Sequence, residues 1–215
     1  MSERWRIVGA GAQGRILLEI LRAAHPDDEV AFLDDSAALQ GQTVLGAPVV
    51  GPVASLDDTH LTLLAIGDNV VRQALAQRHL RARFGVAVHP SAMVSPSARL
   101  GPGTVVFPAA VVHTEAVVGA QVVINTGVIV EHDCVIEDGA SLSPGVRMGG
   151  RVVVGRGAFV STGVTLAPRV KVGAGAVVGA GAVVARDIPG AVLAYGVPAR
   201  VVRPIDATFD WRRLL

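Results

Sequence analysis

Residues 117–142 read VVGAQVVINTGVIVEHDCVIEDGASL, and an aliphatic side chain returns at every sixth position of this stretch. The same phase runs without a slip from Val94 to Val184, and all sixteen positions carry Val, Ile, Leu or Met. A smaller residue, such as Ala116 or Cys134, stands two places before many of them, and glycines follow. A strict six-residue period with glycine turns is typical of short strands joined by tight corners. We therefore expect three strands to close each coil of a three-sided prism, so that residues i and i+18 stack.

The composition agrees with a core of small side chains. Hydrophobic residues make up 51% of the 215 residues, but aromatic residues only 4%, and 25 residues are glycine. The net charge of +1, with no concentration of Lys or Arg, argues against nucleic acid as the main partner. The single cysteine excludes an internal disulfide, and no apolar run reaches the roughly 18 residues of a membrane span. Without a signal-peptide pattern, we expect a cytoplasmic protein with no membrane span.

Residues 1–86 follow a different pattern, in which strands and helices alternate. This alternation is typical of a small, Rossmann-like α/β domain with a mainly parallel sheet. The chain thus divides into an α/β nucleotide-binding domain (1–86), a β-helical domain (87–190) and a C-terminal segment (191–215). The spacing predicts strands at 5–8, 29–35 and 61–69 and helices at 15–24 and 70–84.

The motif GAGAQG sets three glycines, Gly9, Gly11 and Gly14, between the first strand and the first helix. Glycines at this spacing let the backbone approach a pyrophosphate, and the helix N-terminus supplies N–H groups. Asp34 and Asp35 end the next strand, so on these residues alone NAD is a reasonable ligand. However, the domain is only half of a dinucleotide fold, and no dehydrogenase-like domain follows it.

The six-residue repeat resembles that of the hexapeptide-repeat acyltransferases, whose fold is a left-handed parallel β-helix. GAGAQG combined with INTGVIVEHDCVI (124–136) and GVPAR (196–200) is a more specific pattern. It resembles the bacterial nucleotide-sugar N-acetyltransferases of the bacillosamine and perosamine pathways and their sialic-acid O-acetyltransferase relatives. The resemblance extends to about residue 203. It implies acetyl-CoA as donor, a nucleotide-linked amino sugar as acceptor, and a homotrimer with active sites between subunits.

His132 stands between two carboxylates at a predicted corner of the prism, where its side chain points outward. Gly150 stacks one coil later and leaves a backbone N–H bare beside the ring. A neutral imidazole can take a proton from an attacking amine and return it to the departing CoA thiolate. Asp133, or with less support Glu131, would fix the tautomer, and the Gly150 N–H would bind the thioester oxygen. The resemblance carries the base and its acidic partner onto His132 and Asp133.

Several other reactive residues fit less well. The phase puts Cys134 inside the prism, so we expect a core thiol rather than a nucleophile. His89, His113 and His132 have neither matching nor closely paired spacing, which disfavours a shared zinc ion, and we expect no metal. Some relatives have a second histidine nine residues after the first, where this chain has Ser141.

Two grooves complete the predicted site. Thr162 and Ala180 lie on a different edge from His132, and a groove between edges of neighbouring subunits would hold the pantetheine arm of CoA. Pro198, in GVPAR, follows the prism where the resemblance places the adenine end. Candidates for the CoA phosphates, each also explicable as a surface charge, are Arg169, Lys171, Arg186, Arg200 and Arg203.

The resemblance places the acceptor's nucleotide against the glycine motif, with Asp34 and Asp35 near the nucleoside. Asn69 and Asn125 are further substrate-binding candidates. Asp68 and Asn69 end a strand at the same crevice, but they also suit the N-terminus of the next helix. Relatives often have histidine at the position of Gln13, so the sequence does not fix the nucleotide.

Three alternatives stay open at this point. One is O-acetylation of a sugar such as sialic acid, because a hydroxyl acceptor would use the same base. Another is a non-catalytic protein that senses nucleotide sugars or acts as a scaffold. The third is an NAD-dependent oxidoreductase, which would bind NAD tightly.

Overall fold

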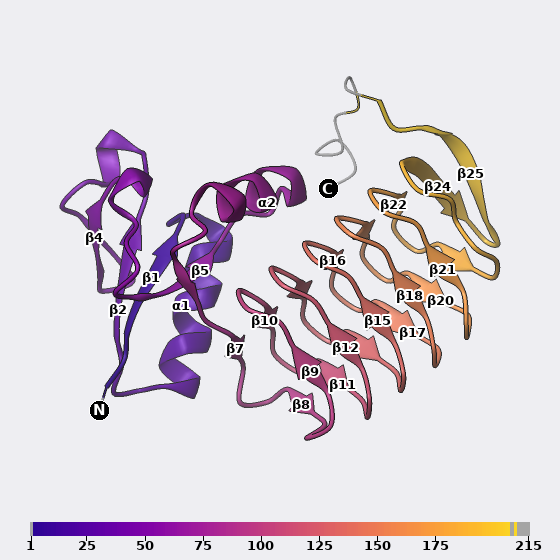
Figure 1. The fold of residues 1–215 in the computed structure, drawn as a ribbon, viewed down its shortest axis with the longest axis horizontal. Coiled ribbons are helices and arrows are strands. Elements are labelled where there is room, and N and C mark those ends of the chain that lie inside the picture. The colour runs from indigo at the N-terminus through magenta and orange to yellow at the C-terminus, as the bar shows by residue number, and fades with distance from the viewer. Residues whose placement is uncertain (1, 207–208, 210–215) are drawn as a thin grey trace.

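The structure, a computed structural model, describes residues 2–206 and residue 209. An α/β domain packs beside a long parallel β-helix, and the indigo-to-purple domain lies against the first coils (Figure 1). The fold class predicted from the two periodicities is confirmed.

The N-terminal domain contains a six-stranded sheet in the order β3-β4-β2-β1-β5-β6, parallel except for the β3–β4 hairpin. Helix α1 covers one face, where Leu17 and Leu21 pack with Trp5. On the other face, Leu75 of α2 packs against the cluster around Val8. The elements are β1 (Arg4–Val8), α1 (Ala12–Ala24), β2 (Glu29–Leu33), the 3-10 turn Ala37–Leu39, β3 (Thr43–Val44), β4 (Ala47–Gly51), the 3-10 turn Val53–Ser55, β5 (Leu61–Leu64), α2 (Asn69–Arg78) and β6 (Arg83–Phe84).

The second helix is shorter than the sequence predicts, and its predicted extension to residue 84 is wrong. Helix α2 ends at Arg78, and Arg83–Phe84 form strand β6, which pairs in parallel with β5. The helical spacing continues into this segment, but Leu80 is 84% exposed, so no buried face supports a longer helix. Gly85 then lets the Trp5 ring lie directly against the backbone.

The β-helix consists of two-residue strands that follow one another every six residues. They are β7 (Ala87–Val88), β8 (Met93–Val94), β9 (Arg99–Leu100), β10 (Val105–Val106), β11 (Val111–Val112), β12 (Val117–Val118), β13 (Val123–Ile124), β14 (Ile129–Val130), β15 (Val135–Ile136), β16 (Ser141–Leu142), β17 (Arg147–Met148), β18 (Val153–Val154), β19 (Phe159–Val160), β20 (Thr165–Leu166), β21 (Lys171–Val172), β22 (Val177–Val178) and β23 (Val183–Val184). An antiparallel hairpin, β24 (Val192–Gly196) and β25 (Ala199–Pro204), extends the sheet that contains β22.

These strands stack into three parallel sheets, which form the faces of the prism. We call the sheet with β7, β13 and β19 the docking face, the sheet with β8, β14 and β20 the second face, and the sheet with β9, β15 and β21 the third face. The corners between them form three edges. The threonine edge (161–164 and its stacked corners) joins docking and second faces, the histidine edge (131–134, 149–152) joins second and third faces, and the helix edge (119–122, 137–140, 155–158) joins third and docking faces.

The interior is a column of small and branched aliphatic side chains, as the phase predicts. From Val106 to Val184 the sixth-position residues are at most 3% exposed. The smaller residues two places earlier, including Ala116, Cys134 and Ala140, are also buried. Stacking at eighteen residues is confirmed by the strand register, for example Val135 opposite Val153.

The N-terminal domain packs on the docking face. Leu17 and Leu21 share one buried cluster with Val105, Phe107 and Val123 of that face. Ile205 and Phe209 cover a second patch of the same face, nearer its C-terminal end, formed by Phe159, Val177 and Leu193. The N-terminal domain and the segment after β25 therefore both pack on the docking face.

Candidate functional site

The His132 side chain lies on the histidine edge and is 47% exposed. Strand β14 ends just before this corner and β15 begins just after it, so the corner projects the ring away from the core. The prediction that the imidazole stands outside the prism is confirmed. The same corner buries Cys134, whose thiol contacts the Gly149 carbonyl at 3.4 Å. Burial raises the pKa of this thiol, so the core-thiol interpretation holds.

Gly150 lies directly against the His132 ring. A Cβ at position 150 would collide with Nε2 and Cε1 of the imidazole, so glycine is required for this packing. The Gly150 carbonyl accepts from the Arg169 N–H at 3.0 Å. Within the described part of the chain, the Gly150 N–H has no acceptor, as expected for a group that receives a ligand oxygen.

Asp133 is the carboxylate that contacts the imidazole, with Oδ2 2.7 Å from His132 Nδ1. Since a carboxylate accepts, Nδ1 carries a proton, and in the neutral form of the ring Nε2 keeps its lone pair. This hydrogen bond, aided by the charge of Arg151, lowers the pKa of Asp133. Arg151 Nε lies 3.5 Å from the same Oδ2. Nε2, which lies on the side of Gly150, is thus available to accept a proton.

Glu131 is engaged elsewhere. Its Oε2 accepts from the His132 backbone N–H at 3.3 Å, and its Oε1 lies 3.8 Å from Nε2 of His113. Of the two candidate carboxylates, Asp133 alone contacts the ring. The sequence interpretation missed Arg151 and the His113–Glu131 pair, although eighteen-residue stacking predicts both contacts: 133 under 151, and 113 under 131.

A groove of about 250 Å³ lies between the N-terminal domain and the docking face. Two predicted site residues, Asn125 and Thr162, line it together with Gln13 and Gly67 of the N-terminal domain. Its remaining walls come from Ile16, Phe107, Val123, Ser141, Leu142, Ser143, Pro144 and Phe159. Gln13 presents a buried Nε2 that lacks a hydrogen-bond partner within the described chain.

Thr162 and Ala180 occupy stacked corners of the threonine edge, as predicted. Pro198 lies at the turn of the β24–β25 hairpin, beyond the last coil. The structure therefore places Asn125, Thr162 and Ala180 on one edge and His132 on another. A prism edge lies opposite the face that it does not border, so within one chain His132 and the docking-face groove are on opposite sides.

The glycine motif forms the predicted strand–turn–helix. Gly9 has φ +97°, and a Cβ on Gly14 would collide with the Gly9 carbonyl. Asp34 Oδ2 accepts from the Ala10 N–H at 2.8 Å, and Asp35 Oδ1 accepts from the Val53 N–H at 2.9 Å. Both carboxylates brace loops at the carboxyl ends of the strands. Gly11 precedes α1 without a side-chain cap, which leaves the helix N–H groups to a ligand.

Asp68 and Asn69, each predicted either to cap the next helix or to bind a ligand, make different contacts. Asp68 caps α2, accepting from the backbone N–H groups of residues 70 and 71 at 2.9 and 3.1 Å. Asn69 is 6% exposed, and its amide N–H groups donate to the carbonyls of Gly157 and Ala158. Since its oxygen accepts from Arg72 and Ser141, both ends of the amide are occupied by protein groups. Asn69 thus links the two domains, and its substrate-binding role stays a prediction.

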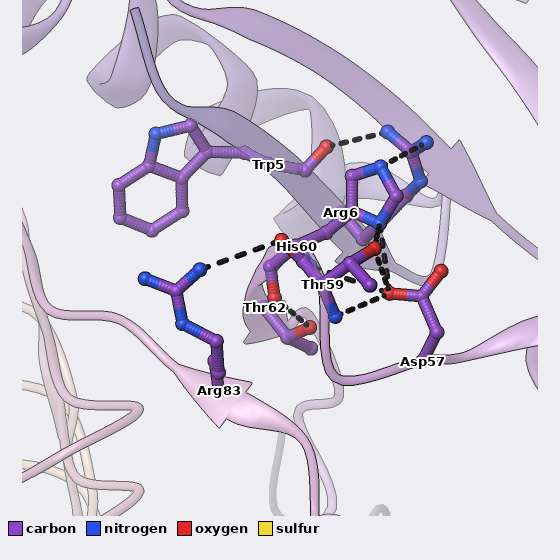
Figure 2. A network of polar contacts seen from close by, with 7 residues as sticks. All are labelled: Trp5, Arg6, Asp57, Thr59, His60, Thr62 and Arg83. Carbon is purple, nitrogen blue, oxygen red and sulfur yellow. Dashed lines mark hydrogen bonds and ion pairs between the residues drawn. The ribbon is translucent and has the colours of Figure 1, made fainter. Parts of the chain in front are cut away.

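A second cluster of ionisable side chains surrounds His60, which directly precedes β5 (Figure 2). His60 Nδ1 lies 2.8 Å from Asp57 Oδ1, and His60 Nε2 lies 2.8 Å from Arg6 Nη2. Because the guanidinium can only donate, Nε2 is the acceptor and Nδ1 donates to Asp57. The His60 hydrogen bond holds the pKa of Asp57 far below its usual range. With both ring nitrogens occupied, this cluster clamps β1 to the loop before β5.

Across residues 2–206 and 209, three or more His, Cys, Asp or Glu side chains nowhere gather in a geometry that would hold a metal ion. The helices of the described chain are all too short or too polar to cross a bilayer.

Known protein families match parts of both domains. Residues 6–79 match the PglD N-terminal domain family, and residues 151–186 match the bacterial transferase hexapeptide (six repeats) family. A search of the curated proteins finds no match.

Solved structures match over almost the whole chain. The acetyltransferase domain of PglB from Neisseria gonorrhoeae FA1090, in complex with acetyl coenzyme A, is 33% identical, with 94% of this chain and 100% of that chain covered and a TM-score of 0.88. PerB from Caulobacter crescentus, in complex with CoA and GDP-perosamine, is 38% identical, with 92% and 96% covered and a TM-score of 0.84. WeeI from Acinetobacter baumannii AYE is 26% identical, with 94% and 100% covered and a TM-score of 0.84.

Proposed function

Because the chain belongs to the family of hexapeptide-repeat acetyltransferases with a PglD-type N-terminal domain, we propose that it acetylates the amino group of a nucleotide-linked amino-deoxy sugar, with acetyl-CoA as donor. The family resemblance inferred from the repeat and the motifs is confirmed by these matches. PerB, at 38% identity, was solved with CoA and GDP-perosamine, which supports this pairing of donor and acceptor. We expect the reaction in the cytoplasm, where acetyl-CoA is available.

The observation that carries the proposal is the arrangement of His132, Asp133 and Gly150. The neutral sugar amine attacks the thioester carbonyl, and a C–N bond forms. His132 Nε2 takes the proton that the amine loses, while Asp133 stabilises the resulting imidazolium through Nδ1–H. The Gly150 N–H donates to the oxygen as negative charge develops on it. The C–S bond then breaks, and the imidazolium protonates the CoA thiolate. No acyl-enzyme is needed.

We further propose that the active site forms between two copies in a homotrimer. In one chain the His132 edge faces away from the docking-face groove, so a second copy is needed to bring them together. Large apolar side chains on the faces beside that edge support a covered surface: Met93, Val117 and Val135 are 58%, 41% and 36% exposed. The groove would receive the acceptor, whose nucleotide lies against Gly9, Gly11 and Gly14.

The donor would lie in a separate groove, between the threonine edge of one copy and an edge of its neighbour. Thr162 and Ala180, on the threonine edge, would line the pantetheine arm, and Pro198 would lie near the adenine end of CoA. Asn125, at the edge of the docking-face groove, would contact the sugar.

The test is a panel of UDP-, GDP- and dTDP-linked 4-amino sugars with acetyl-CoA, followed by thiol release. Sialic acid serves as a hydroxyl acceptor in the same panel. We expect turnover of at least one amino sugar and a fall of about 100-fold or more in kcat for His132→Asn. Absence of acetyl transfer to every acceptor, with nucleotide-sugar binding retained, would instead support a sensor or scaffold.

A mixing experiment tests the shared site. His132→Asn removes the base, and Gln13→Trp fills the groove from the other domain. If each site takes its histidine from one copy and its groove from another, coexpression of the two inactive variants restores about a quarter of the sites. Recovery of no activity, or a particle mass equal to the 22.1 kDa chain, would contradict the proposed assembly.

A further inference from the structure

Arg72 is a buried cation that the proposed mechanism does not use. It lies in α2, is 1% exposed, and burial lowers its pKa to about 10, so it stays charged at pH 7. The hydrogen bonds of its guanidinium within the described chain all end on uncharged oxygens. Burying a charge without a contacting carboxylate costs folding free energy. The hydrogen bonds that Arg72 makes should therefore serve a purpose that offsets this cost.

On one side, the guanidinium binds the loop after β5 and the start of α2. Nη1 donates to the Ile66 carbonyl at 2.7 Å, and Nη2 donates to Asn69 Oδ1 at 2.8 Å. Ile66 directly precedes Gly67, which lines the groove. One wall of the groove is therefore attached to Arg72.

The same guanidinium holds the β-helix on the other side. Nε donates to the Gln121 carbonyl at 3.1 Å, and Nη2 donates to the Gly139 carbonyl at 3.0 Å and to Ser141 Oγ at 3.1 Å. Gln121 and Gly139 are stacked corners of the helix edge. Ser141 lines the groove, and its hydroxyl donates to Asn69 Oδ1 at 2.7 Å. The opposite wall is therefore attached to the same side chain.

We propose that Arg72 is a positioning residue that fixes the orientation of the nucleotide-binding domain on the β-helix and so sets the spacing between the Gly67 and Ser141 walls of the groove. This inference rests on the proposed function for its kinetic consequence, but not for its structural one. Only a planar fork with five N–H donors reaches acceptors in both domains at once, which a lysine ammonium on a flexible stem does not.

The structural test measures the domain orientation directly. Nitroxide labels at Glu19→Cys in α1 and Thr165→Cys in β20 replace two exposed side chains, and Cys134→Ala removes the native thiol. When labelled chain is mixed with an excess of unlabelled chain, so that most assemblies carry one labelled copy, pulsed electron resonance should give one narrow distance distribution with Arg72 present. Arg72→Lys and Arg72→Gln should broaden or shift it, whereas Arg78→Gln, an exposed arginine at the end of the same helix, should not.

The kinetic test separates positioning from stability. For Arg72→Lys, kcat/KM for the sugar nucleotide should fall about tenfold or more, because small misplacements of reactants are costly. The KM for acetyl-CoA should stay within about twofold, since the threonine edge keeps its own backbone ladder.

An unchanged distance distribution in folded Arg72→Lys would overturn the inference. So would equal losses for both substrates that track only the fraction of folded protein. If the wild-type chain transfers no acetyl group, the proposed function fails, but the distance measurement still decides the role of Arg72.

Discussion

The His132 imidazole occupies the space that a side chain at Gly150 would need, one coil further along the same edge. The two positions stack at eighteen residues, so the ring and the bare N–H are placed by the repeat itself. The distance between the proposed base and the proposed oxyanion donor thus depends on a single missing Cβ.

Gly150→Ala should displace the ring and leave the fold intact, because the histidine edge is exposed. We expect kcat to fall by about 100-fold, because the added Cβ moves the proposed base away from its position beside the Gly150 N–H. Steady-state kinetics and the melting temperature should be measured together. Thr114→Ala, two coils earlier on the same edge, is the control; if Gly150→Ala retains wild-type kcat, the close packing of the His132 ring on position 150 is not needed for activity.

Asp133→Asn should lower kcat by about 10-fold to 100-fold, because an amide does not hold the Nδ1–H tautomer as a carboxylate does. Glu131→Gln, on the other side of the histidine, should leave kcat within about threefold, since Glu131 contacts only the backbone of His132. Matching losses in the two variants would remove the distinction between the carboxylates.

Arg151→Gln should raise the pKa of Asp133 toward its ordinary value, because a contacting positive charge is removed. Carboxyl NMR titration measures the shift directly. Arg169→Gln, stacked one coil later, is the matched control. A shift of equal size in the control would mean that the effect is long-range and does not come from the contact.

The Asp57–His60 contact should make stability pH-dependent. A carboxyl pKa depressed by folding contributes stability that is present above the unfolded value and is lost as the pH falls toward the folded value. Asp57→Asn should therefore cost about 1 kcal/mol at pH 7, because Asp57 is partly exposed, and the difference should shrink below about pH 4. Urea unfolding across pH checks this, with neighbouring Asp58→Asn as control; a difference that grows in acid would contradict the assignment.

Cys134 should be unreactive toward a thiol reagent in the folded protein and reactive in urea, because it is buried with a raised pKa. Cys134→Ala should retain most of the acetyl transfer and cost about 1 kcal/mol of stability. Loss of all activity in a folded Cys134→Ala protein would revive the nucleophile hypothesis.

The periodicity predicted the β-helix and the outward position of His132, because each coil repeats the same local geometry. Within that frame, stacking also predicts the contacts of Arg151 and His113. The glycine motif predicted its own strand, turn and helix for a similarly local reason: Gly14 is needed for close packing on Gly9.

The contacts between the two domains could not be predicted from the sequence. Asn69 and Arg72 contact residues of the β-helix that lie 49 to 89 positions away in the chain, and no local pattern marks such pairs. The place of Asn69 at a strand end suits both a ligand-binding residue and the start of the next helix, and this pattern does not predict its contacts with the β-helix. The end of α2 was missed because the helical spacing continues through Leu80 although nothing packs on it.

The uniform coil also limits how this molecule can change length. Removing or adding one residue would rotate every later side chain away from its column, whereas a whole extra coil would leave each column aligned and lengthen the prism by about 4.8 Å. The distance from the His132 corner to the terminal hairpin can consequently change only in steps of one whole coil. Evolution can therefore match it to a longer or shorter ligand only in those steps.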